Sequence, residues 1–73
     1  MREIEVDCYA GYRDEETPRR LRVGWRVVEV LEVLDRWREP DHRFFRLRGD
    51  DGRTYLVRHR EPSRRWELIA ETD

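Results

Sequence analysis

Apolar and polar residues alternate with a period of two in several parts of the chain. Near the start, Ile4, Val6 and Cys8 alternate with acidic residues, and further on Leu21 and Val23 alternate with arginines. This period is typical of strands that bury one side against a core. We therefore predict two short N-terminal strands, each with one buried side.

The connections around these strands are predicted from their turn-forming residues. The charged run RDEETP separates the two strands, and we expect it to form a loop that Pro18 closes. Gly24 follows the second strand, so we predict a tight turn there, just before Trp25.

Residues 26–37, RVVEVLEVLDRW, fit two structures. Their apolar side chains fall on one helical stripe, namely Val27, Val30, Leu31, Leu34 and Trp37. Against a helix stand four valines in seven positions, the lack of an N-cap residue before Arg26, and the turn at Gly24. We favour a long bent strand in which one bulge moves the apolar residues from one side to the other. A helix here, in an α+β fold, is the alternative.

The C-terminal part predicts two hairpins with a defined register. If residues 50–52 form a three-residue loop with Gly52 in the left-handed conformation, Leu47 faces Tyr55 and Phe45 faces Val57. The turn at residues 61–64 then sets Val57 opposite Leu68, Leu56 opposite Ile69, His59 opposite Trp66 and Arg58 opposite Glu67.

Both registers place one set of side chains on a core face. That face consists of Phe45, Leu47, Tyr55, Val57, His59, Trp66, Leu68 and Ala70. The opposite face carries Phe44, Arg46, Arg48, Thr54, Leu56, Arg58, Arg60, Glu67, Ile69 and Glu71. The expected fold is a single all-β domain over residues 1–73, an antiparallel meander of five or six strands curled into a small open barrel or roll of SH3-like size.

Composition narrows the classes of function. Sixteen basic residues, all of them arginine, stand against 17 acidic residues, which leaves a net charge of −1 and argues against nucleic-acid binding through bulk charge. A chain of 73 residues has a thin core with little room for a deep catalytic pocket. There is one cysteine, no CxxC or HxxxH spacing, and no GxSxG, HExxH or phosphate-binding glycine loop. We expect a protein that is not an enzyme and that holds no metal and no cofactor.

The sequence also bears on where in the cell the protein is expected. The chain has no apolar run near the ~20 residues that cross a bilayer, and its first residues lack a signal-peptide core. With a single thiol, we expect a cytoplasmic protein that does not engage a membrane.

Three segments together resemble a known group of proteins. The order LRVGWRVVEVLEVLDRW, then FRLRGDDGRTYLVRH, then RWELIA is similar to an uncharacterised family of small bacterial all-β domains, over residues 3–70. Members occur alone or appended to polymerase-like proteins of DNA-damage tolerance, and the segment CYAGYR is more similar to the free-standing members. The resemblance implies no functional residue, because none is assigned in that family.

The arginine-bearing face is the best candidate for binding. Its guanidinium groups can hold phosphate or carboxylate, and an adjacent ring can stack a base. The candidate residues are Phe44, Arg46, Arg48, Arg58 and Arg60, together with Trp37 and His42 of the neighbouring loop. The competing interpretation, which we favour, is a solvated face on which Arg58 pairs with Glu67 and the other arginines pair with Glu29, Glu32 or Glu71.

Three apolar residues on that face, Phe44, Leu56 and Ile69, suggest that something covers it. The cover is either the N-terminal hairpin completing a barrel, which we favour for so short a chain, or another protein chain. We accordingly expect a monomer or a weak homodimer.

The titratable candidates have simpler explanations. Asp41 with His42 could act as an acid–base pair or bind a metal, but Asp41 after Pro40 is more typical of a turn. His59 and Cys8 fall on core positions and are expected to pack there rather than react.

We therefore predict a non-enzymatic binding module, with a protein segment as the expected partner. Binding of single-stranded nucleic acid by the arginine and aromatic face is the alternative. The positions of Glu29, Glu32, Glu67 and Glu71 discriminate between them, because carboxylates placed between the arginines would repel phosphate.

Overall fold

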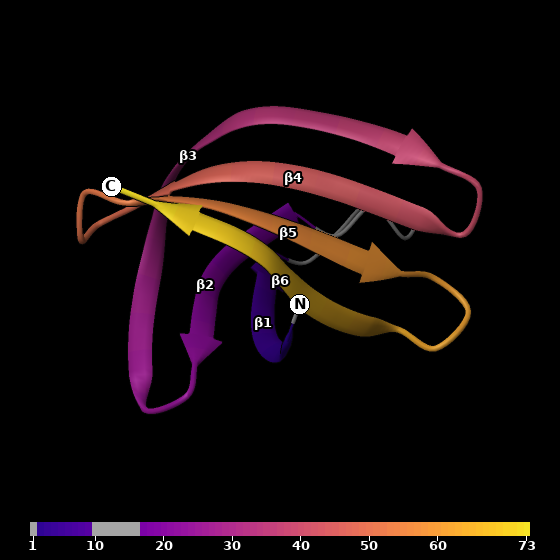
Figure 1. Ribbon diagram of the computed structural model, residues 1–73, viewed down its shortest axis with the longest axis horizontal. Coiled ribbons are helices and arrows are strands. Elements are labelled where there is room, and N and C mark those ends of the chain that lie inside the picture. Colours follow the sequence, from indigo (N-terminus) through magenta and orange to yellow (C-terminus); the bar gives the residue numbers. More distant parts are fainter. Residues whose placement is uncertain (1, 10–16) are drawn as a thin grey trace.

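The computed structural model describes residues 2–9 and 17–73, whose regular structure consists of six strands. They are β1 Arg2–Tyr9, β2 Thr17–Val23, β3 Arg26–Glu39, β4 His42–Gly49, β5 Thr54–Arg60 and β6 Arg65–Thr72. Each strand pairs antiparallel with the next, and β6 pairs with β1, so the sheet closes into a barrel (Figure 1). The predicted small all-β barrel is confirmed, and the helical alternative for residues 26–37 is wrong.

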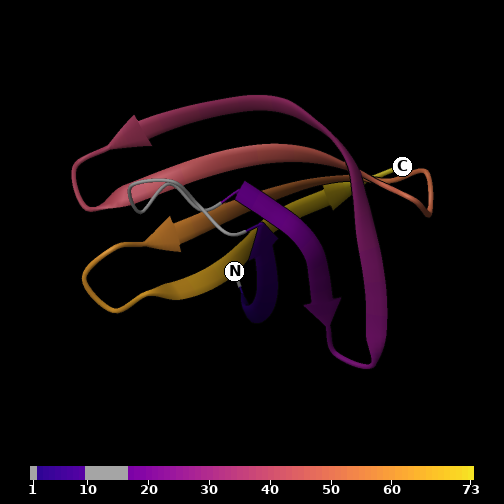
Figure 2. The same cartoon turned by 180° about the vertical axis from the view of Figure 1, so that it is seen from behind.

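Closure depends on β1, which divides its pairing between two neighbours. Its first part pairs with β6, where Ile4 lies opposite Trp66, and its second part pairs with β2 from Glu5 onward. The N-terminal hairpin therefore crosses the concave side of the β4–β5–β6 sheet, as the view from behind shows (Figure 2). It closes over the core face, so the expectation that it covers Phe44, Leu56 and Ile69 is wrong.

The bent strand β3 belongs to both halves of the barrel. Residues 26–29 pair with β2, whereas the segment from Val30 to Glu39 pairs with β4. Two irregularities, between Val30 and Glu32 and between Val33 and Asp35, interrupt the pairing with β4, where the sequence predicted one bulge. Figure 1 shows the result, a strand that rises from the β2 side and then arches along β4.

The predicted register of β4 and β5 is confirmed. Leu47 lies opposite Tyr55, and Phe45 lies opposite Val57. The loop between the two strands has the expected geometry, because Gly52 has a φ of 82°, in the region that favours glycine.

The register of β5 and β6 is correct in one half and wrong in the other. Val57 lies opposite Leu68 as predicted, but Leu56 lies opposite Ala70 rather than Ile69. A register shift between Leu56 and Val57 leaves Ile69 as an extra residue on β6. Ala70 consequently leaves the predicted core face and is exposed.

Pro18 is a residue of β2, so the prediction that it closes the loop between the first two strands is wrong. It lies in β2 opposite Cys8, and its side chain is fully buried. A proline is tolerated here because the position is near the start of the strand, beside the register shift between Asp7 and Cys8. The charged residues 13–16 of the predicted loop lie outside the described residues.

The core joins both halves of the barrel. Its buried apolar members are Ile4, Leu21, Val23, Val28, Phe45, Leu47, Tyr55, Val57, Trp66 and Leu68, with Val6, Cys8, Val30 and Val33 packed against them. Arg43 and His59 are the buried polar residues of the described chain. Because this core lies on one side of the β4–β5–β6 sheet, the other side of that sheet is a surface of the molecule.

Gly49 tests how tightly this core is packed. A Cβ added there would lie 2.5 Å from Cγ1 of Val28 and 3.0 Å from Cε2 of Tyr55, and both are core side chains. We expect Gly49→Ala to lower the free energy of unfolding in urea by about 1–3 kcal/mol. The loss should be smaller in a Val28→Ala background, where the closest atom is gone. An unchanged urea midpoint for Gly49→Ala would contradict the packing.

Ionisation of Tyr55 is expected to make the free energy of unfolding depend on pH in the alkaline range. Burial and a hydrogen bond donated to Asp51 raise the pKa of the Tyr55 hydroxyl from 10.0 to about 12. The neutral hydroxyl is thus favoured in the folded state, and this stabilisation is fully present below pH 10 and is lost as the pH rises to about 12. We expect the free energy of unfolding to fall by roughly 2 kcal/mol over that interval. Tyr55→Phe should show a shallower decline, and an equal decline in both proteins would contradict the assignment.

Candidate functional site

The candidate site lies on the β3–β4 hairpin, where alternate residues point to opposite sides. On the outer side, the rings of Trp37 and Phe44 stack at a centroid distance of 5.2 Å and an angle of 2°. His42 lies next to them, its ring centroid 6.2 Å from that of Phe44. We call these three residues the outer aromatic cluster. Their positions follow from the pairing of β3 with β4, in which Trp37 lies opposite Phe44 and Glu39 lies opposite His42.

Two of the four predicted arginines on this outer face have an acidic partner. Arg58 pairs with Glu67 at 2.6 Å, and both side chains are largely buried. Arg48 makes a longer contact of 3.9 Å with Glu32. These two acids lie on β3 and β6, at the two flanks of the arginine-bearing strands β4 and β5, and each reduces the positive charge that a phosphate would meet at its partner arginine.

The other two predicted arginines are not neutralised in this way. Arg46 and Arg60 are both exposed, and within residues 2–9 and 17–73 no carboxylate oxygen lies within 4.0 Å of either guanidinium. The interpretation of the whole face as mutually paired charge is therefore correct for one half of it only.

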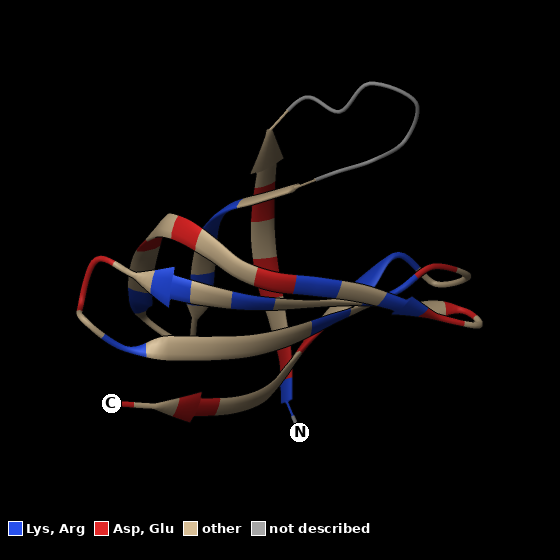
Figure 3. Cartoon of the chain, turned by 90° about the horizontal axis from the view of Figure 1, so that it is seen from above, with Lys and Arg blue, Asp and Glu red and all other residues tan. Residues whose placement is uncertain are grey.

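Glu29 and Glu71 serve other parts of the barrel. Glu29 accepts two hydrogen bonds from Arg20, at 2.9 and 3.0 Å, and this pairing lowers the pKa of Glu29. Glu71 pairs with Arg26 at 3.2 Å and with Arg53 at 3.5 Å. Neither acid lies among the outer-face arginines, and β3 carries both signs of charge whereas the charged residues of β4 are all arginines (Figure 3).

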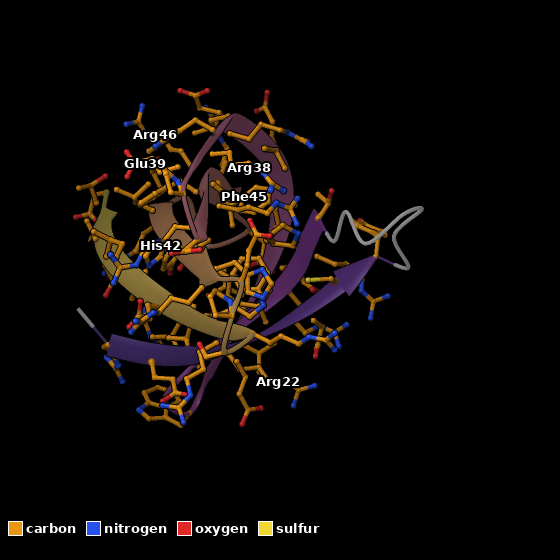
Figure 4. The ribbon with its side chains drawn as sticks, turned by 90° about the vertical axis from the view of Figure 1, so that its right-hand side faces the viewer. Arg22, Arg38, Glu39, His42, Phe45 and Arg46 are labelled. Atoms are coloured by element: carbon orange, nitrogen blue, oxygen red, sulfur yellow. The ribbon has the colours of Figure 1, made fainter. Side chains whose placement is uncertain are left out.

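A second group of arginines lies on the inner side of the same hairpin. Arg36 lies opposite Phe45, and Arg38 lies opposite Arg43. The guanidinium carbons of Arg43 and Arg36 lie 5.2 and 6.0 Å from the centre of the Phe45 ring, within the range of a cation–π contact. Figure 4 shows Arg38 and Phe45 on one side of the hairpin, with Glu39, His42 and Arg46 on the other.

The inner arginines differ in how their charges are balanced. Arg38 pairs with Glu61 at 3.1 Å. For Arg36 and Arg43, no carboxylate oxygen lies within 4.0 Å in the part of the chain that the structure describes. Arg43 is nevertheless only 9% exposed. We call Arg36, Arg38, Arg43 and Phe45 the inner arginine cluster, and it borders a cleft of about 170 Å³.

Sequence reasoning missed Arg36 and Arg43 as site residues. Arg36 belongs to the predicted bent strand, and Arg43 belongs to the predicted loop with Trp37 and His42, which is wrong because those three residues lie in β3 and β4. The inward direction of both arginines depends on the bulges of β3 and on the register with β4. The available signal was the spacing of Arg43 and Phe45. Residues two apart in a strand lie on the same face, and Phe45 was already placed on the core face.

The titratable candidates occupy structural positions. Asp41 lies in the turn between β3 and β4 with a φ of 67°, as expected of a turn-forming residue. His59 is buried and stacks on Trp66 at 4.3 Å, while Cys8 packs against the core. Among the described residues, no group of three or more His, Cys, Asp or Glu side chains is placed to hold a metal.

A further apolar residue is exposed at the opposite end of the barrel. Trp25, in the turn between β2 and β3, is 92% exposed, and Val27 beside it is 58% exposed. Trp25 is remote from the outer aromatic cluster along β3, which makes it a useful control position.

Comparison with known proteins found no matching protein family, no matching curated protein and no matching solved structure. The resemblance to a bacterial domain family stays a prediction. Within the described residues, no helix is long and apolar enough to span a membrane.

The stacking of Trp37 on Phe44 can be measured by a double-mutant cycle. We expect Trp37→Leu and Phe44→Leu each to destabilise the protein, with a coupling free energy of about 0.5–1.5 kcal/mol in urea unfolding. Trp25→Leu combined with Phe44→Leu is the control and should show no coupling. Additive losses in the first cycle would contradict the stacked arrangement.

Proposed function

We propose that the protein is a non-enzymatic module that binds an extended protein segment along the free edge of β3. The observation that carries the proposal is the length of β3. It has 14 residues, but β2 pairs with only Arg26–Glu29. From Val30 to Glu39, no described strand pairs with β3 on the side away from β4.

An unpaired strand edge offers a row of backbone donors and acceptors to a partner. In an antiparallel ladder, alternate residues direct their N–H and C=O groups away from the existing neighbour. An extended segment can add to such an edge through main-chain hydrogen bonds, while its alternate side chains give specificity. The segment from Val30 to Glu39 is long enough for several such pairs.

The features of this edge favour a foreign segment over a second copy of the chain. Its two register irregularities and its charges, which lie at Glu32, Asp35, Arg36, Arg38 and Glu39, are the devices by which sheets resist pairing with their own copies. A partner must therefore match the local charges in order to bind.

The side chains around the edge indicate what the partner carries. On the outer side, Trp37 stacks with Phe44 and offers an apolar anchor of the kind that dominates binding energy. On the inner side of the same strand, Arg36 has no carboxylate oxygen within 4.0 Å among the described residues, whereas Arg38 pairs with Glu61. The partner chemistry that fits is a segment in which apolar residues alternate with acidic ones.

Binding of single-stranded nucleic acid is supported less well. Exposed Arg46 and the outer aromatic cluster favour it, but Glu67 neutralises Arg58 and Glu32 lies beside Arg48. A short mixed-sequence DNA strand tests it. Salt-reversible NMR shifts at Phe44 and Arg46 would favour nucleic acid over a peptide.

Selection from a display library of random 12-residue peptides tests the proposed function. We expect binders that alternate apolar and acidic residues, and we expect them to slow amide hydrogen exchange in residues 30–39. Trp37→Ala should weaken the best peptide at least tenfold, as loss of an aromatic anchor does. Trp25→Ala, a matched tryptophan at the other end of the barrel, should leave the affinity within twofold. A library without binders, or binders that protect other strands, would refute the proposal.

A further inference from the structure

The inner arginine cluster holds more positive charge than the described chain balances. Arg36 and Arg43 lie against the Phe45 ring, Arg38 lies opposite Arg43, and Glu61 pairs with Arg38 alone of the three. Arg43 is 9% exposed, so much of its hydration is lost. A buried charge without an ionic partner is costly, because the attraction of water is removed and no opposite charge replaces it.

The stacking on Phe45 offsets part of this cost and directs the cations. Cation–π contacts of Arg43 and Arg36 with one ring hold both guanidinium groups on the same side of the hairpin. Their planar N–H groups remain available as donors, since no side-chain hydrogen bond from either group is formed within the described ranges. Such groups suit phosphate and carboxylate oxygens.

We propose that the inner arginine cluster is a binding site for a phosphate monoester group. Two guanidinium charges are left unbalanced, and a phosphate monoester carries about −1.5 to −2 charges at pH 7. A carboxylate balances only one of the two. The match of charge therefore favours phosphate.

The size of the cleft limits what carries the phosphate. Its volume is about 170 Å³, below the roughly 300–1,000 Å³ of sites that enclose drug-sized molecules. The cleft admits the phosphate group with a short attachment, such as the side chain of a phosphorylated residue, and leaves a nucleoside outside. The cleft is also lined by Trp37 and Phe44, so this site shares Arg36 and Trp37 with the β3 edge of the proposed function. Arg43 lies on β4, away from that edge, and its variants therefore separate phosphate binding from strand addition.

The site is tested first with inorganic phosphate, at ionic strength held constant with sodium chloride. We expect saturable changes in the NMR signals of the Arg36 and Arg43 Nε–Hε groups, with a dissociation constant in the millimolar range. Phosphoserine should compete for the same signals, while adenosine monophosphate should bind no more tightly than phosphate. Tighter binding of the nucleotide would overturn the assignment to a side-chain phosphate. Equal changes with chloride alone would overturn the site.

Matched variants separate this site from general positive charge. Arg43→Met and Arg36→Met should each weaken phosphate at least tenfold. Arg46→Met removes the same charge from the outer face of the same hairpin and should change the affinity less than twofold. Equal weakening by all three would overturn the proposal. Arg43→Lys keeps the charge without the planar fork and provides a folded substitute if Arg43→Met unfolds, and it should weaken phosphate by several-fold.

Discussion

The division of β1 between two neighbours is the constraint on which the rest of the structure depends. A thin six-stranded meander can exclude water from its centre only if its ends meet, and Ile4 opposite Trp66 is where they meet. Closure at that point directs Phe45, Leu47, Tyr55 and Val57 into one core with the N-terminal hairpin. It also leaves the other face of β4–β5–β6 outside, with its arginines and its aromatic residues.

Closure also explains why the far half of β3 has one edge with no described strand beside it. Since β2 is a short strand that must reach β1, it accompanies β3 only as far as Glu29. The rest of β3 has β4 on one side and, among described residues, no strand on the other. The surfaces with functional promise therefore gather on one hairpin. Its free edge, outer aromatic cluster and inner arginine cluster all lie within residues 30–45.

The two sides of the hairpin differ in electrostatic character although their composition is similar. On the outer side, Arg58 and Arg48 have acidic neighbours across the sheet, whereas Arg46 and Arg60 are exposed to water without one among the described residues. On the inner side, curvature brings Arg36 and Arg43 around Phe45, and Arg43 is buried there without a described acid. Near-neutral net charge thus conceals a local excess of positive charge, which pairwise counting along the sequence does not detect.

The sequence by itself determined most of the strands, one core face and the two C-terminal hairpin turns. Period-two alternation places Leu47 and Val57 inward, and the need for a residue with positive φ sets the loop at Gly52, because both are local properties of the backbone. Candidate residues Phe44, Arg46 and Arg58 could be placed on one face for the same reason, whereas Trp37 was expected in a neighbouring loop.

Only the tertiary structure decided the features that depend on contacts between distant strands. The extra residue at Ile69 exposes Ala70, and Pro18 becomes a buried strand residue opposite Cys8, since both adjust to curvature that the closed barrel imposes. The face over which the N-terminal hairpin closes, and the inward direction of Arg36 and Arg43, follow from that closure. A local sequence pattern indicates which side chains share one face of a strand. Which other strands or solvent that face contacts depends on how the sheet closes.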